Sequence, residues 1–122
     1  MPKIEDCTIQ GKTTRFTEYN DIKEIIAIIG ENDQFHDGTI EHISHDPDAT
    51  IVSFKHHEDP EHKIRRLIFT GNVELTMNLD LLVRYIYVIS CEIDDKIGIY
   101  FDGTGIIVKA DSVKYEIQEL LC

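Results

Sequence analysis

Short alternating segments separated by turn residues fill the chain from residue 39 onward, and this pattern constrains the fold more than any other feature. Apolar and polar side chains alternate in residues 39–45 and 50–56, and Asp46-Pro47-Asp48 between them has the composition of a tight turn. The two segments are expected to form a hairpin. Six more segments of strand-like composition follow, in residues 63–70, 72–77, 84–93, 97–101, 106–110 and 112–120.

Strands at this spacing, joined by short turns, are typical of antiparallel sheets. The sequence shows no strand-helix-strand alternation, so a Rossmann-type nucleotide site is not expected. Residues 84–93 are rich in β-branched and aromatic side chains, which predicts a central strand. Residues 78–85 fit either a short helix or a crossover between two sheets.

One amphipathic helix is predicted ahead of these strands, in residues 17–32. Thr17 is the candidate N-cap, Glu18 and Asp21 suit the positive end of the helix dipole, and Gly30 is the candidate stop. An apolar stripe at helical spacing is expected to rest on the sheet, formed by Tyr19, Ile22, Ile25, Ile26 and Ile29. The predicted fold is a single α+β domain over residues 1–122, mainly antiparallel β, with one N-terminal helix packed on a sheet or sandwich of about seven to eight strands.

The compartment is predicted from what the sequence lacks. No segment approaches the run of about 18 apolar residues that a membrane span needs, and the start MPKIEDC has no apolar signal region. Cys7, Cys91 and Cys122 share no metal-type or redox-type spacing, so reduced thiols are expected. These observations predict a soluble, cytoplasmic protein that does not associate with membranes.

Negative charge is concentrated in the first half of the chain. Residues 1–61 hold 14 acidic residues against 5 Lys and Arg, whereas residues 62–122 hold 9 against 7, within a total net charge of −11. Lys55 is the one basic residue, histidine apart, among nine acids in residues 31–61. Such a segment repels phosphate, so nucleic-acid binding is not expected, and a basic protein partner is favoured. An ordinary solubilising surface is the alternative.

Six histidines in a short chain raise the question of a metal site. His42 and His45 are three residues apart in a predicted strand, where they point to opposite faces and converge only across a bulge. His42 and His56 could face each other across the hairpin, with a carboxylate completing the site. These three histidines are the metal candidates, and polar strand and loop positions or pH sensing are the alternatives.

Catalytic motifs are weak in this sequence. His36-Asp37 has no accompanying nucleophile motif, and FDGTG at residues 101–105 joins two predicted strands without a following helix. Neither a catalytic residue nor a cofactor is expected. The one basic cluster is Lys63, Arg65 and Arg66, which fits an anion site or, more simply, a solvated strand edge.

FHDGTIEHI, at residues 35–43, carries a family resemblance. An amphipathic helix, then Phe-His-Asp-Gly opening a strand, then a hairpin and RLIFTGNVEL resemble a group of small bacterial proteins, many assigned as immunity proteins of polymorphic toxin systems. The resemblance covers most of residues 20–117 and implies a cytosolic antitoxin that binds and blocks a secreted toxin domain, often a basic nuclease. It implies no catalytic residues. The extra histidines and the absence of tryptophan depart from the group.

Charge and resemblance together predict an acidic immunity protein rather than an enzyme. Its cognate toxin domain would be bound by acids of the charged segment, namely Asp37, Glu41, Asp46, Asp48, Glu58, Asp59 and Glu61. Two alternatives stay open: a small His-rich metal-binding protein, and a structural homodimeric β module without a toxin partner.

Overall fold

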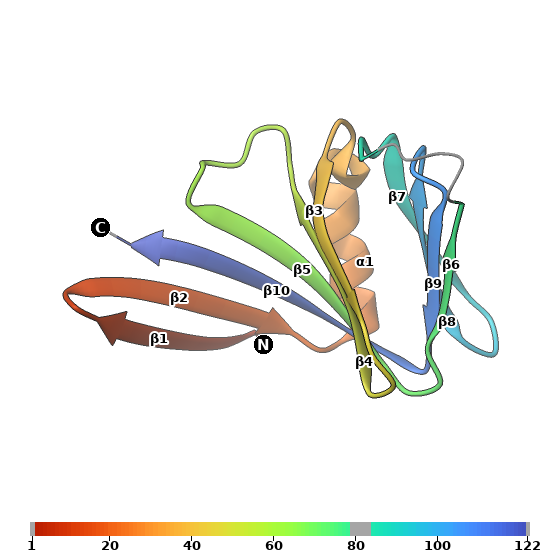
Figure 1. Cartoon of the computed structure of the whole chain (residues 1–122), viewed down its shortest axis with the longest axis horizontal. Coiled ribbons are helices and arrows are strands. Elements are labelled where there is room, and N and C mark those ends of the chain that lie inside the picture. Colours follow the sequence, from red (N-terminus) through yellow and green to blue (C-terminus); the bar gives the residue numbers. More distant parts are fainter. Residues whose placement is uncertain (1, 79–83, 122) are drawn as a thin grey trace.

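The computed structural model describes residues 2–78 and 84–121, which form two antiparallel sheets and one α-helix (Figure 1). In chain order the elements are β1 (Lys3–Ile9), β2 (Lys12–Tyr19), α1 (Ile22–Glu31), the 3-10 turn η1 (Asp33–Phe35), β3 (Thr39–His45), β4 (Ala49–Lys55), β5 (Lys63–Thr70), β6 (Glu74–Met77), β7 (Val88–Ile93), β8 (Ile97–Asp102), β9 (Ile106–Ala110) and β10 (Ser112–Leu121). The predicted α+β class, mainly antiparallel with one helix on a sheet, is confirmed, with ten strands in the described residues instead of seven or eight.

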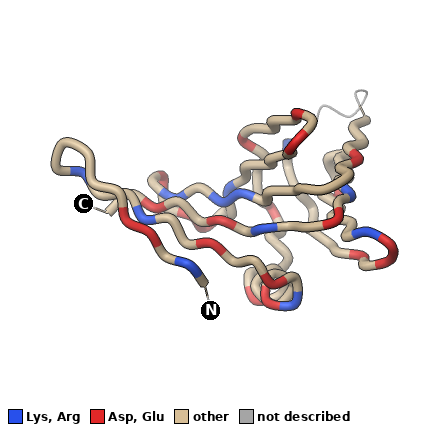
Figure 2. The backbone as a smooth tube through the Cα atoms, turned by 90° about the horizontal axis from the view of Figure 1, so that it is seen from below, with Lys and Arg blue, Asp and Glu red and all other residues tan. Residues whose placement is uncertain are grey.

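The larger sheet has the strand order β1-β2-β10-β5-β4-β3, and the smaller sheet has the order β6-β9-β8-β7. Every pairing is antiparallel. The last strand of the chain, β10, lies inside the larger sheet between β2 and β5, so it joins the N-terminal hairpin to the rest of the fold. Both termini lie on the side of this hairpin, away from the smaller sheet (Figures 1 and 2).

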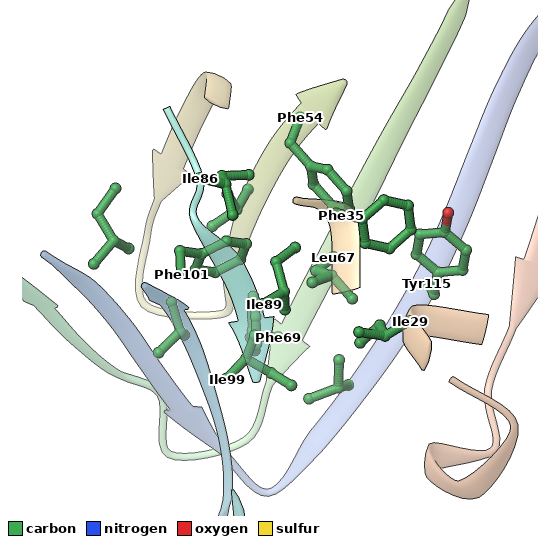
Figure 3. Close-up of a cluster of buried hydrophobic side chains, with 14 of the residues drawn as sticks. Ile29, Phe35, Phe54, Leu67, Phe69, Ile86, Ile89, Ile99, Phe101 and Tyr115 are labelled. Atoms are coloured by element: carbon green, nitrogen blue, oxygen red, sulfur yellow. The ribbon is translucent and has the colours of Figure 1, made fainter. Parts of the chain in front are cut away.

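A continuous core fills the space between the larger sheet, the smaller sheet and α1 (Figure 3). Alternation within strands selects its members, because side chains of odd and even positions point to opposite faces of a sheet. In β5, for example, Leu67 and Phe69 are fully buried while Ile68, between them, is only half-buried. The smaller sheet contributes Ile99 and Phe101 to the same core.

The predicted helix begins later than expected. Thr17 is wrong as the N-cap, because residues 12–19 form β2; Asp21 caps the helix, its side chain accepting a hydrogen bond of 3.0 Å from the Lys23 N–H. The buried stripe is Ile25 and Ile29, whereas Ile26 is 38% exposed.

The end of the helix and two later segments also differ from expectation. Gly30 lies inside the last turn and Asn32 is the C-cap. The predicted central strand is β7, which begins at Val88 and lies at an edge of the smaller sheet. The alternatives for residues 78–85 fall mostly on residues 79–83, which lie outside the described residues. No helix in the described part of the chain is long and apolar enough to span a membrane.

Candidate protein-binding surface

Three segments distant in sequence meet where the FHDG motif leads from α1 into β3. The amide N–H of Asp37 donates to the Ile86 carbonyl at 3.0 Å, and the N–H of Ile86 donates to the Gly38 carbonyl at 2.8 Å. The imidazole Nδ1 of His57 lies 3.1 Å from the His36 carbonyl oxygen, which brings the segment after β4 to the same place. We call the exposed side of this junction the FHDG corner and define it by His36, Asp37, His57, Glu58, Tyr85 and Tyr87.

The backbone of the motif adopts a conformation that few sequences tolerate. Positive φ values of 54° to 64° occur at Asp33, Gln34, Phe35 and Asp37. At Gly38 an added Cβ would lie 2.9 Å from both the Lys55 and the Phe35 carbonyl oxygens. Backbone oxygens cannot move aside without shifting their strands, so the motif requires glycine at this position.

Phe35 anchors the corner to the core (Figure 3). Its ring is fully buried and makes edge contacts with Phe54 at a centroid distance of 5.0 Å and with His56 at 5.6 Å. The guanidinium carbon of Arg65 lies 5.0 Å from the centre of the same ring, close enough for a cation–π interaction. The left-handed turn therefore places Phe35 in the core and keeps His36 and Asp37 near the surface.

A buried polar network supports the anchor from the loop between β4 and β5. Asp59 receives hydrogen bonds from Arg65, at 2.9 Å from Nε and from Nη2, and from the His56 backbone N–H at 2.8 Å. Arg65 also donates to the Tyr115 hydroxyl at 2.6 Å. Both charged side chains are less than 10% exposed, so their mutual pairing is what offsets their desolvation.

The network sets the protonation of its members. Burial alone would raise the pKa of Asp59, but hydrogen bonds from Arg65 and from the His56 N–H hold it below its ordinary value. Burial raises the pKa of Tyr115 to about 12, in spite of the neighbouring guanidinium. Asp59 and Arg65 are therefore ionised around neutral pH and Tyr115 is neutral.

The exposed side of the corner carries two large aromatic side chains. Tyr85 and Tyr87 are 70% and 64% exposed, while Ile86 between them is buried. Their backbone is fixed, because the Arg84 carbonyl accepts from the Ile40 N–H at 2.8 Å and the Tyr87 N–H donates to the Asp102 carbonyl at 2.7 Å. The sequence did not predict a binding site at this pair, since tyrosines on either side of a buried isoleucine also fit the solvent face of an ordinary strand.

The corner also carries histidines and carboxylates, one of which, His36, contacts Tyr87. The His36 ring packs edge-on against Tyr87 at 5.3 Å, and its Nδ1 lies 3.2 Å from the Asp37 carboxylate. The His57 Nε2 lies 3.7 Å from the carboxylate of Glu58, whose side chain is 75% exposed. The corner thus presents aromatic rings beside two exposed carboxylates.

The structure separates the seven acids that the sequence nominated as partner contacts. Asp37 and Glu58 belong to the corner, and Glu61 lies nearby in the loop between β4 and β5. Glu41 occupies the bulge of edge strand β3. Asp59 differs from the rest because its side chain is only 3% exposed and is held by Arg65, so it is not available to a partner.

Asp46 and Asp48 lie at the opposite end of β3 and β4, in the hairpin turn. At a rise of about 3.3 Å per residue, a seven-residue strand puts that turn about 20 Å from the corner. The Asp46 carboxylate accepts from the backbone N–H groups of Asp48 and Ala49, both at 2.9 Å, and these bonds lower its pKa. Figure 2 shows the same spread, with acidic positions along the whole tube and basic positions among them.

The three candidate metal ligands do not converge. His42 pairs with Ser53 and His45 with Thr50 across β3 and β4, on opposite faces of the sheet, as the strand geometry predicted. His56 lies beyond the end of β4, buried against Phe35, and does not face His42. Within residues 2–78 and 84–121, no three His, Cys, Asp or Glu side chains are placed to hold a metal ion.

The basic cluster is not a solvated strand edge, because β5 lies between β10 and β4 inside the larger sheet. Arg65 belongs to the buried network, and Arg66 on the other face pairs with Glu116 at 3.2 Å and Gln118 at 2.6 Å. Cys7 and Cys91 are free thiols.

Comparison with protein-family models, with curated proteins and with solved structures finds no match for this chain.

Proposed function

We propose that this chain is an inhibitory binding protein of the immunity type, which covers a basic surface of a cognate secreted toxin domain with the FHDG corner. The observation that carries the proposal is the pair Tyr85 and Tyr87, both well over half exposed on a backbone that is hydrogen-bonded to both neighbouring segments. Inhibition by coverage needs no catalytic residue and no cofactor. Its place of action would be the cytoplasm, where the incoming toxin acts.

Exposed tyrosines on a fixed backbone are favourable binding anchors. Tyrosine is enriched at interface hot spots because a large ring buries much area and has few rotatable bonds to immobilise. The costs of ordering a loop on binding are also avoided where the backbone is already fixed. Tyr85 and Tyr87 meet both conditions, since Ile86 locks their segment into the core.

The charge around the tyrosines supports a basic partner. Asp37 and Glu58 belong to the same corner as the rings and are 69% and 75% exposed, and the whole chain has a net charge of −11. Arginine suits such a surface because its guanidinium stacks on an aromatic face and binds a carboxylate with two hydrogen bonds. A toxin domain that acts on nucleic acid carries basic groups of this kind.

The first test is whether the gene next to that of this chain encodes a large secreted protein with a C-terminal toxin domain, and binding is then measured with that domain. We expect a stable complex by calorimetry and protection of cells that express the toxin domain. The double variant Tyr85→Ala/Tyr87→Ala should lose about 2 kcal/mol or more of binding, about thirtyfold in Kd, with little change in melting temperature.

The matched control is Tyr100→Ala, which removes a tyrosine from β8 whose hydroxyl bonds to Glu92 on the outer face of the smaller sheet. Its affinity for the toxin domain should stay within about twofold of the wild type. Failure of the wild-type chain to bind the adjacent toxin domain would contradict the proposed function. Equal losses in the control and the double variant would contradict the assignment of the corner.

A further inference from the structure

Four strands form the edges of the two sheets, and three of them are protected against pairing with another chain. β3 carries a bulge at Glu41, and its first residues are already bonded to residues 84–86. β6 has only four residues, and β7 lies against η1. Bulges, short length and cover are the usual means by which a sheet edge avoids pairing with a second edge.

β1 has no bulge, is seven residues long and, within the described residues, is not covered by a strand on its outer side, and the protection that its edge does carry is charge, at Lys3, Glu5 and Asp6. It pairs with β2 in an unbroken register from Lys3 to Ile9, and all seven of its residues are exposed. Its other side faces no strand in the described part of the chain. The turn of the β1–β2 hairpin extends away from α1 and the smaller sheet (Figure 1). Ile4 and Ile9 are 58% and 67% exposed there.

The first three residues of β1 are complementary to themselves. Lys3 and Glu5 lie on one face, where their side chains are 63% and 66% exposed and 3.2 Å apart, and Ile4 lies between them on the other face. In an antiparallel pair of two such strands centred on Ile4, each Lys3 stands opposite Glu5 of the second copy, and the two Ile4 side chains meet. Both the charged pairs and the apolar pair are favourable.

We propose that two copies of this chain associate through antiparallel pairing of their β1 edges, centred on Ile4, to give a two-fold symmetric dimer with one continuous sheet. Other centres are less favourable: Glu5 or Asp6 at the centre would place like charges opposite each other, and Cys7 at the centre leaves Lys3 without a carboxylate. An isologous contact of this kind closes at two copies and does not propagate. It lies at the end of the sheet opposite β3 and does not depend on the proposed function.

The test is sedimentation of the purified chain from about 5 to about 500 micromolar. We expect a monomer–dimer equilibrium. Lys3→Glu should raise the dimer dissociation constant about tenfold or more, because it places two like-charged pairs across the interface. The swap Lys3→Glu/Glu5→Lys restores both opposite-charge pairs and should restore dimerisation. Circular dichroism controls for the folding of each variant.

Three outcomes would overturn the proposal: a monomer throughout the range, a dimer that Lys3→Glu does not weaken, or no recovery in the charge swap.

The register is tested separately by oxidation with copper phenanthroline. Ile4→Cys in a Cys7→Ser background should form a covalent dimer, whereas the native Cys7 in the wild-type chain should not link two β1 strands. Linkage through Cys7 in place of position 4 would reject the register centred on Ile4.

Discussion

The FHDG corner requires glycine at position 38, because the backbone there leaves room for a hydrogen atom and not for a Cβ. A methyl group there would meet two carbonyl oxygens at 2.9 Å, so Gly38→Ala should lower the free energy of unfolding by about 1–3 kcal/mol. Gly30→Ala is the matched control, since nothing lies within 4 Å of an added Cβ and alanine favours a helix by about 0.5–1 kcal/mol. Urea unfolding measures both. Equal effects of the two substitutions would contradict the steric explanation.

His56 links the corner to pH. Its side chain is 8% exposed and its Nε2 has no hydrogen-bond partner among the described residues. Burial lowers the pKa of His56, as does the nearby His57; Arg65 acts in the same direction, while Asp59 and Glu58 oppose it. The unfolded chain therefore binds a proton near pH 6.5 that the folded chain does not, and stability present above that pH is lost as the pH falls below it.

The expected result is a free energy of unfolding that declines between about pH 7 and pH 5, with a smaller slope in His56→Gln. The comparison variant is His42→Gln, because His42 is exposed on β3. Chemical denaturation across this pH range measures the slopes. A slope that His56→Gln leaves unchanged would show that His56 does not cause the decline.

Among the elements, those buried on one face were predictable and those exposed on both were not. β5 alternates clearly, and β4 alternates apart from its buried Ser53, because the core lies on one side of them. β1 has no such pattern, since neither face is buried. The last three residues of β2, 17–19, were included in the helix prediction because Tyr19 continues the apolar spacing of α1. Hydrophobic periodicity reflects the burial of one face, so a strand with neither face buried shows no clear alternation in its sequence.

Edge and central positions were harder to distinguish than strand and helix. β7 is rich in the residues of a central strand, yet it lies at an edge of the smaller sheet, with η1 packed against it. The Asp59–Arg65 pair was hidden for a related reason: a charge on a strand is read as exposed unless its partner is known. The partner comes from the loop before β5, and only the folded loop brings the two together.

In the whole molecule, the acids of residues 31–61 do not form one continuous acidic surface. Residues 31–61 are dense in acids along the chain, but folding sends Asp37 and Glu58 to one end of β3 and β4 and Asp48 to the other. A protein partner that binds the corner therefore meets only part of the charge. The rest acts over distance, through the net charge of −11.

These two contributions can be separated by comparing Glu58→Lys with Asp48→Lys. Each changes the net charge by the same amount, one at the FHDG corner and one at the far turn, where the Asp48 side chain is exposed. If the corner binds a basic toxin domain, Glu58→Lys should slow association about three- to tenfold at low salt and Asp48→Lys much less, and the difference should shrink as salt screens the charges. Stopped-flow association rates at two ionic strengths measure this. Equal slowing by both variants would mean that net charge alone steers the encounter, whereas a larger effect of Asp48→Lys would move the binding surface to the hairpin turn.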